Sequence, residues 1–143
     1  MKKVIETTHL LNAPMEEVWA HIKTGANWEN WLPLLSSSEM KGEGEGAKRV
    51  CYTQDGHALQ ETIVTSNDET KTFQYSIDEQ EMLPMKDILG TIQLSEKAGQ
   101  TQMDWKVDFE LLVEEALPEV KVNIEEIYKQ AAAKLDELAL AKA

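Results

Sequence analysis

Glu61 is the side chain whose type and position most invite chemistry. It stands between the alternate apolar residues Leu59 and Ile63 in a stretch rich in β-branched types. A strand here would therefore direct the carboxylate into apolar surroundings. A buried carboxylate must form an ion pair, accept hydrogen bonds or stay protonated. Three roles are open to it: a salt bridge, for example with Lys86; a polar anchor for a ligand; or general acid–base catalysis together with Tyr75.

The other potentially reactive side chains form no recognisable site. His9, His21 and His57 lack metal-ligand spacing, and no cysteine joins them, so we expect neither a metal nor a cofactor. Cys51 has no His or Asp beside it and is expected to be a small buried side chain rather than a nucleophile. The glycine-rich stretch 41–46 carries two glutamates and lacks the Gly-Lys-Ser/Thr of a phosphate-binding loop, so it reads as a hairpin connection.

Strands joined by turns must position Glu61 and Tyr75. Alternating or β-branched segments predict strands at 3–11, 34–40, 48–54, 58–66, 72–77, 86–94 and 102–112. Asp55-Gly56 predicts a two-residue hairpin between the third and fourth strands. Because no helix separates the last six strands, the pattern favours an antiparallel meander over β-α-β units. Two short helical segments, one opening at Pro14 and one over 27–33, follow the first strand.

A long helix over about 118–141 is the element that the sheet must accommodate. Pro118 suits its first turn. Its apolar residues recur at spacings of three and four: Val120, Ile124, Ile127, Tyr128, Ala131, Leu135, Leu138 and Ala139. Such a stripe needs a broad apolar surface. We therefore predict an α+β fold over residues 1–143, a single domain in which a curved antiparallel sheet grips this helix around a small-molecule cavity.

Strand and helix phases predict which side chains line the cavity. The last strand alternates most cleanly and turns Met103, Trp105 and Val107 inward. The connection 78–85 has an apolar tip that either adapts to ligands at the cavity mouth or folds back on the core. Trp28 and Trp31 share a face, and they either close one end of the core or contact a ligand. The expected ligand-binding residues are Glu61, Ile63, Phe73, Tyr75, Met82, Met85, Lys86, Ile88, Met103, Trp105, Val107, Ile124 and Tyr128.

The composition of the chain restricts its possible partners and its cellular location. Fourteen Lys and Arg against 26 Asp and Glu give a net charge of −12, which disfavours nucleic acid and anionic membrane surfaces. A single cysteine excludes an internal disulfide, and no apolar run reaches the ~20 residues of a membrane span. Glu6 interrupts the signal-like start of the chain. We expect a cytoplasmic protein whose oligomeric state stays open.

The order of these elements resembles the START-like (SRPBCC) superfamily, which includes polyketide cyclases and plant ligand carriers. The resemblance covers essentially the whole chain. It rests on Ala13-Pro14-Met15-Glu16-Glu17-Val18-Trp19, Trp28…Trp31-Leu32-Pro33, Glu61-Thr62-Ile63, Phe73-Gln74-Tyr75-Ser76-Ile77 and Thr101…Trp105. It implies the helix-grip fold, a seven-stranded curved sheet around the C-terminal helix with a cavity between them.

Three functions are compatible with this fold. Binding, transport or sensing of a small hydrophobic molecule, such as a lipid, polyketide or isoprenoid, is favoured by the aromatic and methionine lining and by the lack of a catalytic constellation. A polyketide cyclase/dehydrase type of enzyme would use Glu61 and Tyr75. A protein-interaction module would have a filled core. Cavity volume separates the module from the other two, and turnover that depends on Glu61 separates the enzyme from the carrier.

Overall fold

The computed structural model describes residues 1–141 of the chain. Its seven strands form one antiparallel sheet in the order β1-β7-β6-β5-β4-β3-β2. The strands are β1 (Lys2–Leu11), β2 (Leu35–Lys41), β3 (Lys48–Thr53), β4 (Ala58–Asn67), β5 (Thr72–Glu79), β6 (Met85–Lys97) and β7 (Gln100–Leu111). The helical segments are α1 (Met15–Ile22), η1 (Trp28–Asn30), η2 (Glu114–Ala116) and α2 (Leu117–Leu140). The predicted sheet, the two short helical segments after the first strand and the long C-terminal helix are confirmed.

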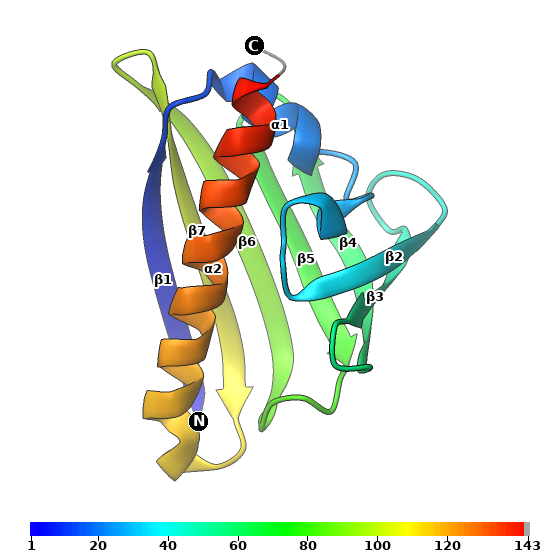
Figure 1. The fold of residues 1–143 in the computed structure, drawn as a ribbon. Coiled ribbons are helices and arrows are strands. Elements are labelled where there is room, and N and C mark those ends of the chain that lie inside the picture. Colours follow the sequence, from blue (N-terminus) through cyan, green and yellow to red (C-terminus); the bar gives the residue numbers. More distant parts are fainter. Residues whose placement is uncertain (142–143) are drawn as a thin grey trace.

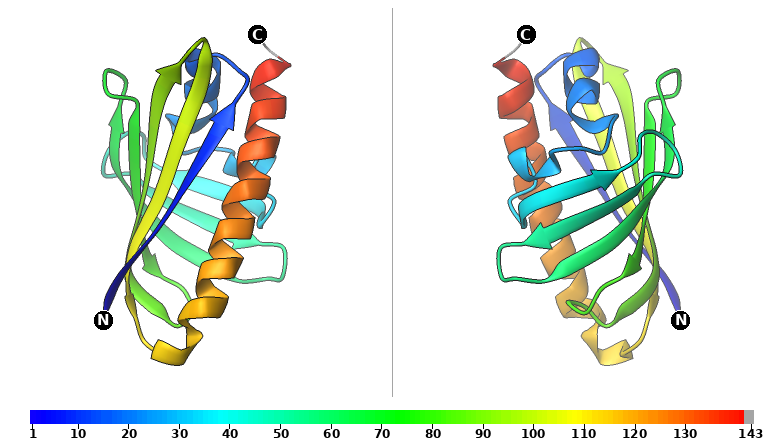
Figure 2. Two further views of the ribbon diagram at one scale, coloured as in Figure 1. Left: turned by 90° about the vertical axis from the view of Figure 1, so that its left-hand side faces the viewer. Right: turned by 90° about the vertical axis from the view of Figure 1, so that its right-hand side faces the viewer.

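The sheet curls around α2, which lies over its concave face beside β1 and β7 (Figure 1 and Figure 2). The helix buries the predicted apolar stripe, including Ile124, Tyr128 and Leu135. Asp136 fixes its C-terminal half, because one carboxylate oxygen accepts a hydrogen bond from the backbone N–H of Ala13 at 2.9 Å. No helix within residues 1–141 combines the length and apolar content that crossing a bilayer requires.

β7 carries the regular alternation that the sequence predicts. Every second residue along it is buried, and the residues between them are half-buried and polar. Trp105 is completely buried at the centre of this strand, where it pairs with Thr7 of β1 and Ile92 of β6. The inward side chains of β7 therefore form the floor on which α2 and the cavity rest.

β6 departs from regular alternation, and this corrects one prediction. Met85 and Ile88 are buried, whereas Lys86 and Asp87 between them are exposed. The register shifts between Lys86 and Leu89, and Asp87 has a φ of 51°, which together mark a β-bulge. The extra residue reverses the phase of the strand, so Lys86 and Ile88 lie on opposite faces. The expectation that Lys86 faces the cavity is wrong.

The hairpin between β3 and β4 has a different loop from the predicted one. The backbone N–H of Thr53 donates to the carbonyl of His57 at 2.9 Å, so the loop is Gln54–Gly56 rather than Asp55-Gly56 alone. Gly56 has a φ of 91°, which suits the left-handed residue of a three-residue hairpin loop. This register places Arg49 directly opposite Glu61 on the neighbouring strand.

Candidate functional site

A cavity of about 320 Å³ lies between the sheet and α2. Most of its lining residues are aliphatic or aromatic, and they come from η1, β2–β7 and α2 as well as the β5–β6 connection. The lining includes these members of the expected set: Glu61, Tyr75, Met82, Met85, Ile88, Trp105, Val107, Ile124 and Tyr128. Ile63, Phe73 and Met103 are buried in the core away from the lining, and Lys86 is exposed. Ligand contact by any of these residues stays a prediction.

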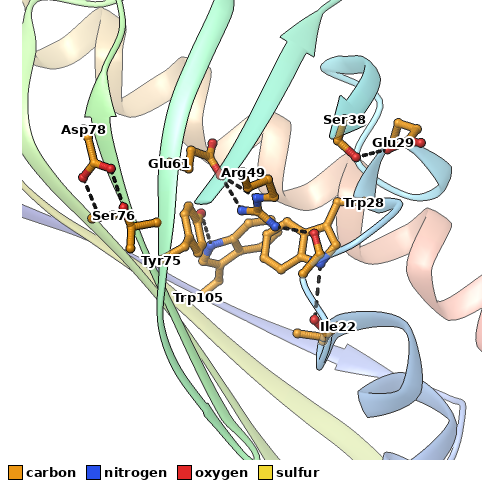
Figure 3. Close-up of polar contacts among 12 residues, drawn as sticks. Ile22, Trp28, Glu29, Ser38, Arg49, Glu61, Tyr75, Ser76, Asp78 and Trp105 are labelled. Carbon is orange, nitrogen blue, oxygen red and sulfur yellow. Dashed lines mark hydrogen bonds and ion pairs between the residues drawn. The ribbon is translucent and has the colours of Figure 1, made fainter. Parts of the chain in front are cut away.

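Arg49 and Glu61 form a buried ion pair at the edge of the cavity (Figure 3). The Nε and Nη2 groups of Arg49 donate to Oε1 of Glu61 at 2.8 and 2.5 Å. Nη1 donates to the backbone carbonyl of Gly25 at 2.8 Å, which links the strand to the α1–η1 connection. Arg49 is 1% exposed and Glu61 4% exposed. The partner of Glu61 is therefore Arg49 and not Lys86.

Aromatic rings and electrostatics together hold this pair. The guanidinium carbon of Arg49 lies 4.2 Å from the ring centroid of Trp28 and 5.3 Å from that of Tyr75. Burial opposes the charge of Arg49, but the carboxylate of Glu61 outweighs it and raises the pKa of the guanidinium. Burial likewise raises the pKa of the Glu61 carboxyl, and the attraction of Arg49 offsets only part of this effect. The two charges balance each other inside the cavity wall.

Cys51 completes the surroundings of Glu61. Burial, together with the negative charge of the nearby carboxylate, raises the pKa of the Cys51 thiol to about 12. The expectation that Cys51 is buried is confirmed, because the residue is 1% exposed. It supports Glu61 and is not placed to act as a thiolate nucleophile.

The reactivity of Cys51 provides a direct test of this environment. We expect a disulfide reagent at about pH 8 to label the native chain at least about a thousandfold more slowly than the chain unfolded in guanidinium, because very little thiolate exists at a pKa near 12. The measurement is the rate of thiolate release from the coloured reagent. Fast stoichiometric labelling of the native protein would contradict the arrangement.

A second polar cluster lies deeper, where Trp105, Tyr75 and Tyr128 meet. The indole N–H of Trp105 donates to the hydroxyl oxygen of Tyr75 at 3.1 Å (Figure 3). The hydroxyl of Tyr128, on α2, interacts with that of Tyr75. The Tyr128 ring stacks on Trp105, with ring centroids 3.8 Å apart and planes 5° from parallel. Burial raises the pKa of Tyr75 to about 12 and that of Tyr128 well above its ordinary value. Both phenols are therefore protonated at neutral pH.

Trp28 and Trp31 close one end of the core, as the first of their two predicted roles requires. Each is 1% exposed, and their ring centroids are 4.7 Å apart. Trp28 also lines the cavity, whereas Trp31 does not. Trp28 therefore both closes the core and lines the cavity. Its contact with a ligand stays a prediction.

The mouth of the cavity lies between α2, the β5–β6 connection and the segment before β2. Met82 and Leu83 are half-buried and pack against the core while lining the cavity. Gln80 holds their connection, because its amide nitrogen donates to the carbonyls of Leu83 and Met85, both at 2.9 Å. A shallower hollow of about 340 Å³ adjoins the cavity and shares Ile127 with it, among other lining residues.

The chain resembles known proteins in sequence and in fold. A family model described as polyketide cyclase / dehydrase and lipid transport matches residues 2–139. XoxI from Bacillus cereus is 25% identical with a TM-score of 0.84, over 96% of this chain and 95% of that one. Major latex-like protein 151 from Panax ginseng is 16% identical with a TM-score of 0.84, over 97% and 98%. A Nitrosospira multiformis protein is 21% identical with a TM-score of 0.78, over 94% of each chain. No curated protein sequence matches the chain.

Proposed function

Because the chain belongs to the polyketide cyclase/dehydrase and lipid transport family, we propose that it binds a small hydrophobic molecule, of the lipid, polyketide or isoprenoid kind, as a carrier or sensor. The observation that supports this most is the cavity of about 320 Å³ with its aliphatic and aromatic lining. That volume lies within the range of small-molecule sites, and a few polar groups in an apolar wall are their usual composition. A hollow of this size also favours ligand binding over an interaction module with a filled core.

The state of the polar groups favours binding over catalysis. Glu61 is engaged in a buried ion pair with Arg49, whose two hydrogen bonds hold its Oε1 oxygen. The raised pKa of Tyr75 keeps its hydroxyl from acting as a base at neutral pH. An enzyme of the cyclase/dehydrase kind would need one of these groups, and this is why we favour a carrier or sensor.

The cellular location and the domain organisation of the protein are part of the same proposal. We infer a cytoplasmic protein that acts as a single domain, because its one cysteine is buried and unpaired and one hydrophobic cluster joins the sheet to α2. The net charge of −12 makes nucleic acid an unsuitable partner.

Native mass spectrometry of gently purified protein tests the proposal first. We expect a stoichiometric apolar adduct, and solvent extraction of that adduct identifies its chemical class. A protein that carries no adduct and binds no neutral apolar probe, such as N-phenyl-naphthylamine, would contradict ligand binding. Turnover of an extracted compound that is lost in Glu61→Gln, a variant that keeps the volume of the side chain, would instead support the enzyme.

Blocking the mouth provides a matched pair of variants on one helix. Ile127 is half-buried on α2 and lines the cavity, whereas Val122 is 64% exposed on the same helix. We expect Ile127→Trp to weaken binding of N-phenyl-naphthylamine about tenfold, because the indole overfills the mouth. Val122→Trp should bind as the unchanged chain does. Equal fluorescence titrations for the two variants would show that the probe binds elsewhere.

A further inference from the structure

The hydroxyl cluster contains more donor hydrogens than it can use internally. Trp105, Tyr75 and Tyr128 each carry one polar hydrogen. One hydrogen bond runs from the indole N–H to the Tyr75 oxygen, and the two neighbouring hydroxyls can share at most a second one. Whichever hydroxyl donates in the second bond, one phenolic hydrogen is left over. Tyr75 is 6% and Tyr128 8% exposed, and both line the cavity, so this hydrogen lies beside the empty space.

Arg49 adds to the same surplus. A guanidinium has five N–H hydrogens, and hydrogen bonds to Glu61 and Gly25 use three of those of Arg49. Within residues 1–141 no carbonyl or carboxylate oxygen accepts the other two. Both hydrogen bonds that Glu61 accepts from Arg49 go to its Oε1 oxygen. This end of the cavity therefore offers several donor hydrogens that no group of the chain uses.

The charge balance limits what can accept these hydrogens. The carboxylate of Glu61 already compensates the charge of Arg49, so an anionic ligand would bring an unbalanced charge into the cavity wall. A cationic ligand would meet the positive charge of Arg49. A hydrocarbon would leave the donors unsatisfied, which costs free energy in a buried site.

We propose that this end of the cavity is a donor-rich subsite for a neutral carbonyl oxygen, as in a ketone, ester, lactone or quinone. Tyr75, Tyr128 and Arg49 supply the hydrogens, and the apolar part of the ligand lies along Ile88, Val107 and Ile124. The inference rests on the proposed function, since it specifies the class of molecule that the cavity takes. The residues of this subsite decide which ligands the cavity prefers.

Three probes of equal heavy-atom number and shape test the subsite on the intact chain. They are acetylnaphthalene, isopropylnaphthalene and naphthylethylammonium, with the substituent at the same ring carbon. We expect the ketone to bind about tenfold more tightly than the hydrocarbon, the factor that one net hydrogen bond provides. The ammonium should bind most weakly. Quenching of tryptophan fluorescence measures all three, because Trp28 and Trp105 line the cavity.

Two further readouts locate the carbonyl. The isotope-edited infrared C=O stretching band of bound acetylnaphthalene should lie at the frequency that it has in an alcohol solvent. It should not lie at the frequency that it has in a hydrocarbon solvent. Its methyl protons should show nuclear Overhauser contacts to the ring protons of Tyr75 or Tyr128. Equal affinities for the ketone and the hydrocarbon, a hydrocarbon-like band, or contacts only to mouth residues such as Gln130 would overturn the subsite and leave the carrier proposal standing. Failure of all three probes to bind would overturn both.

Discussion

Replacing Arg49 with methionine should lower the free energy of unfolding by about 3–5 kcal/mol. Methionine is unbranched and apolar but shorter than arginine, so the change removes the ion pair together with the guanidinium that lies over Trp28. It leaves the carboxylate of Glu61, 4% exposed, without the two N–H donors that now satisfy it. It also frees the carbonyl of Gly25. Equilibrium unfolding in urea, followed by tryptophan fluorescence, measures the change.

The double variant Arg49→Met/Glu61→Leu separates the cost of an unpaired charge from the loss of a favourable contact. Replacing both members of a buried ion pair by apolar residues of similar volume is often neutral or stabilising. We therefore expect the double variant to recover most of the stability that Arg49→Met loses. Lys48→Met is the matched control, because Lys48 is the exposed neighbour of Arg49 and should change stability by no more than about 0.5 kcal/mol. A double variant as unstable as the single one would contradict the electrostatic account.

The pH dependence of the free energy of unfolding has a definite sign in the unchanged chain, in Arg49→Met and in the double variant. Because burial raises the pKa of Glu61, the folded chain binds more protons than the unfolded chain above the ordinary pKa of a glutamate. Stability at this site therefore falls as the pH rises above that ordinary value. The fall should be larger and extend to higher pH in Arg49→Met, where no cation opposes the effect of burial, and it should be absent from the double variant. Urea unfolding of the three proteins at a series of pH values tests this order.

Most of the fold could be predicted because its signals are local. Alternation in β7, hairpin turns between the strands and the apolar stripe of α2 each depend on neighbouring residues only. Their order carried the resemblance to the START-like superfamily, which the family match over residues 2–139 confirms. The inward positions of Trp105 and Val107 followed from the same alternation.

The polar end of the cavity could not be predicted because it depends on single-residue shifts in register. A two-residue turn at Asp55-Gly56 would pair Arg49 with Thr62, and only the longer loop brings Arg49 opposite Glu61. The bulge after Lys86 has the same effect in β6, since one extra residue changes which face the lysine occupies. The signal for Arg49 in the sequence was the one arginine of the chain, two residues before the cysteine of a predicted strand. That signal is informative only once the register is known.

Gly90 is the position at which a single added carbon should disturb the site most. It lies opposite Tyr75 on β6, and a Cβ there would stand 2.2 Å from Cζ and 2.5 Å from the hydroxyl oxygen of Tyr75. The tyrosine cannot retreat easily, because Trp28 packs against its ring with centroids 5.3 Å apart and Trp105 holds its hydroxyl. We expect Gly90→Ala to lower the free energy of unfolding by about 3 kcal/mol, the upper part of the range for overpacked cores.

The sign of this effect distinguishes steric from conformational causes. Gly90 lies in a strand and outside the left-handed region, so alanine would ordinarily stabilise the chain by about 0.4–1 kcal/mol. The cost should therefore come from the ring of Tyr75, and Gly90→Ala/Tyr75→Leu should be more stable than the sum of its two single changes predicts. Urea unfolding of the four proteins gives the coupling energy, and additive costs would remove Tyr75 as the cause. In Gly90→Ala the displaced ring can move only toward the cavity, so binding of acetylnaphthalene should weaken together with stability. The absence of a side chain at Gly90 thus keeps both the hydroxyl cluster and the space beside it in place.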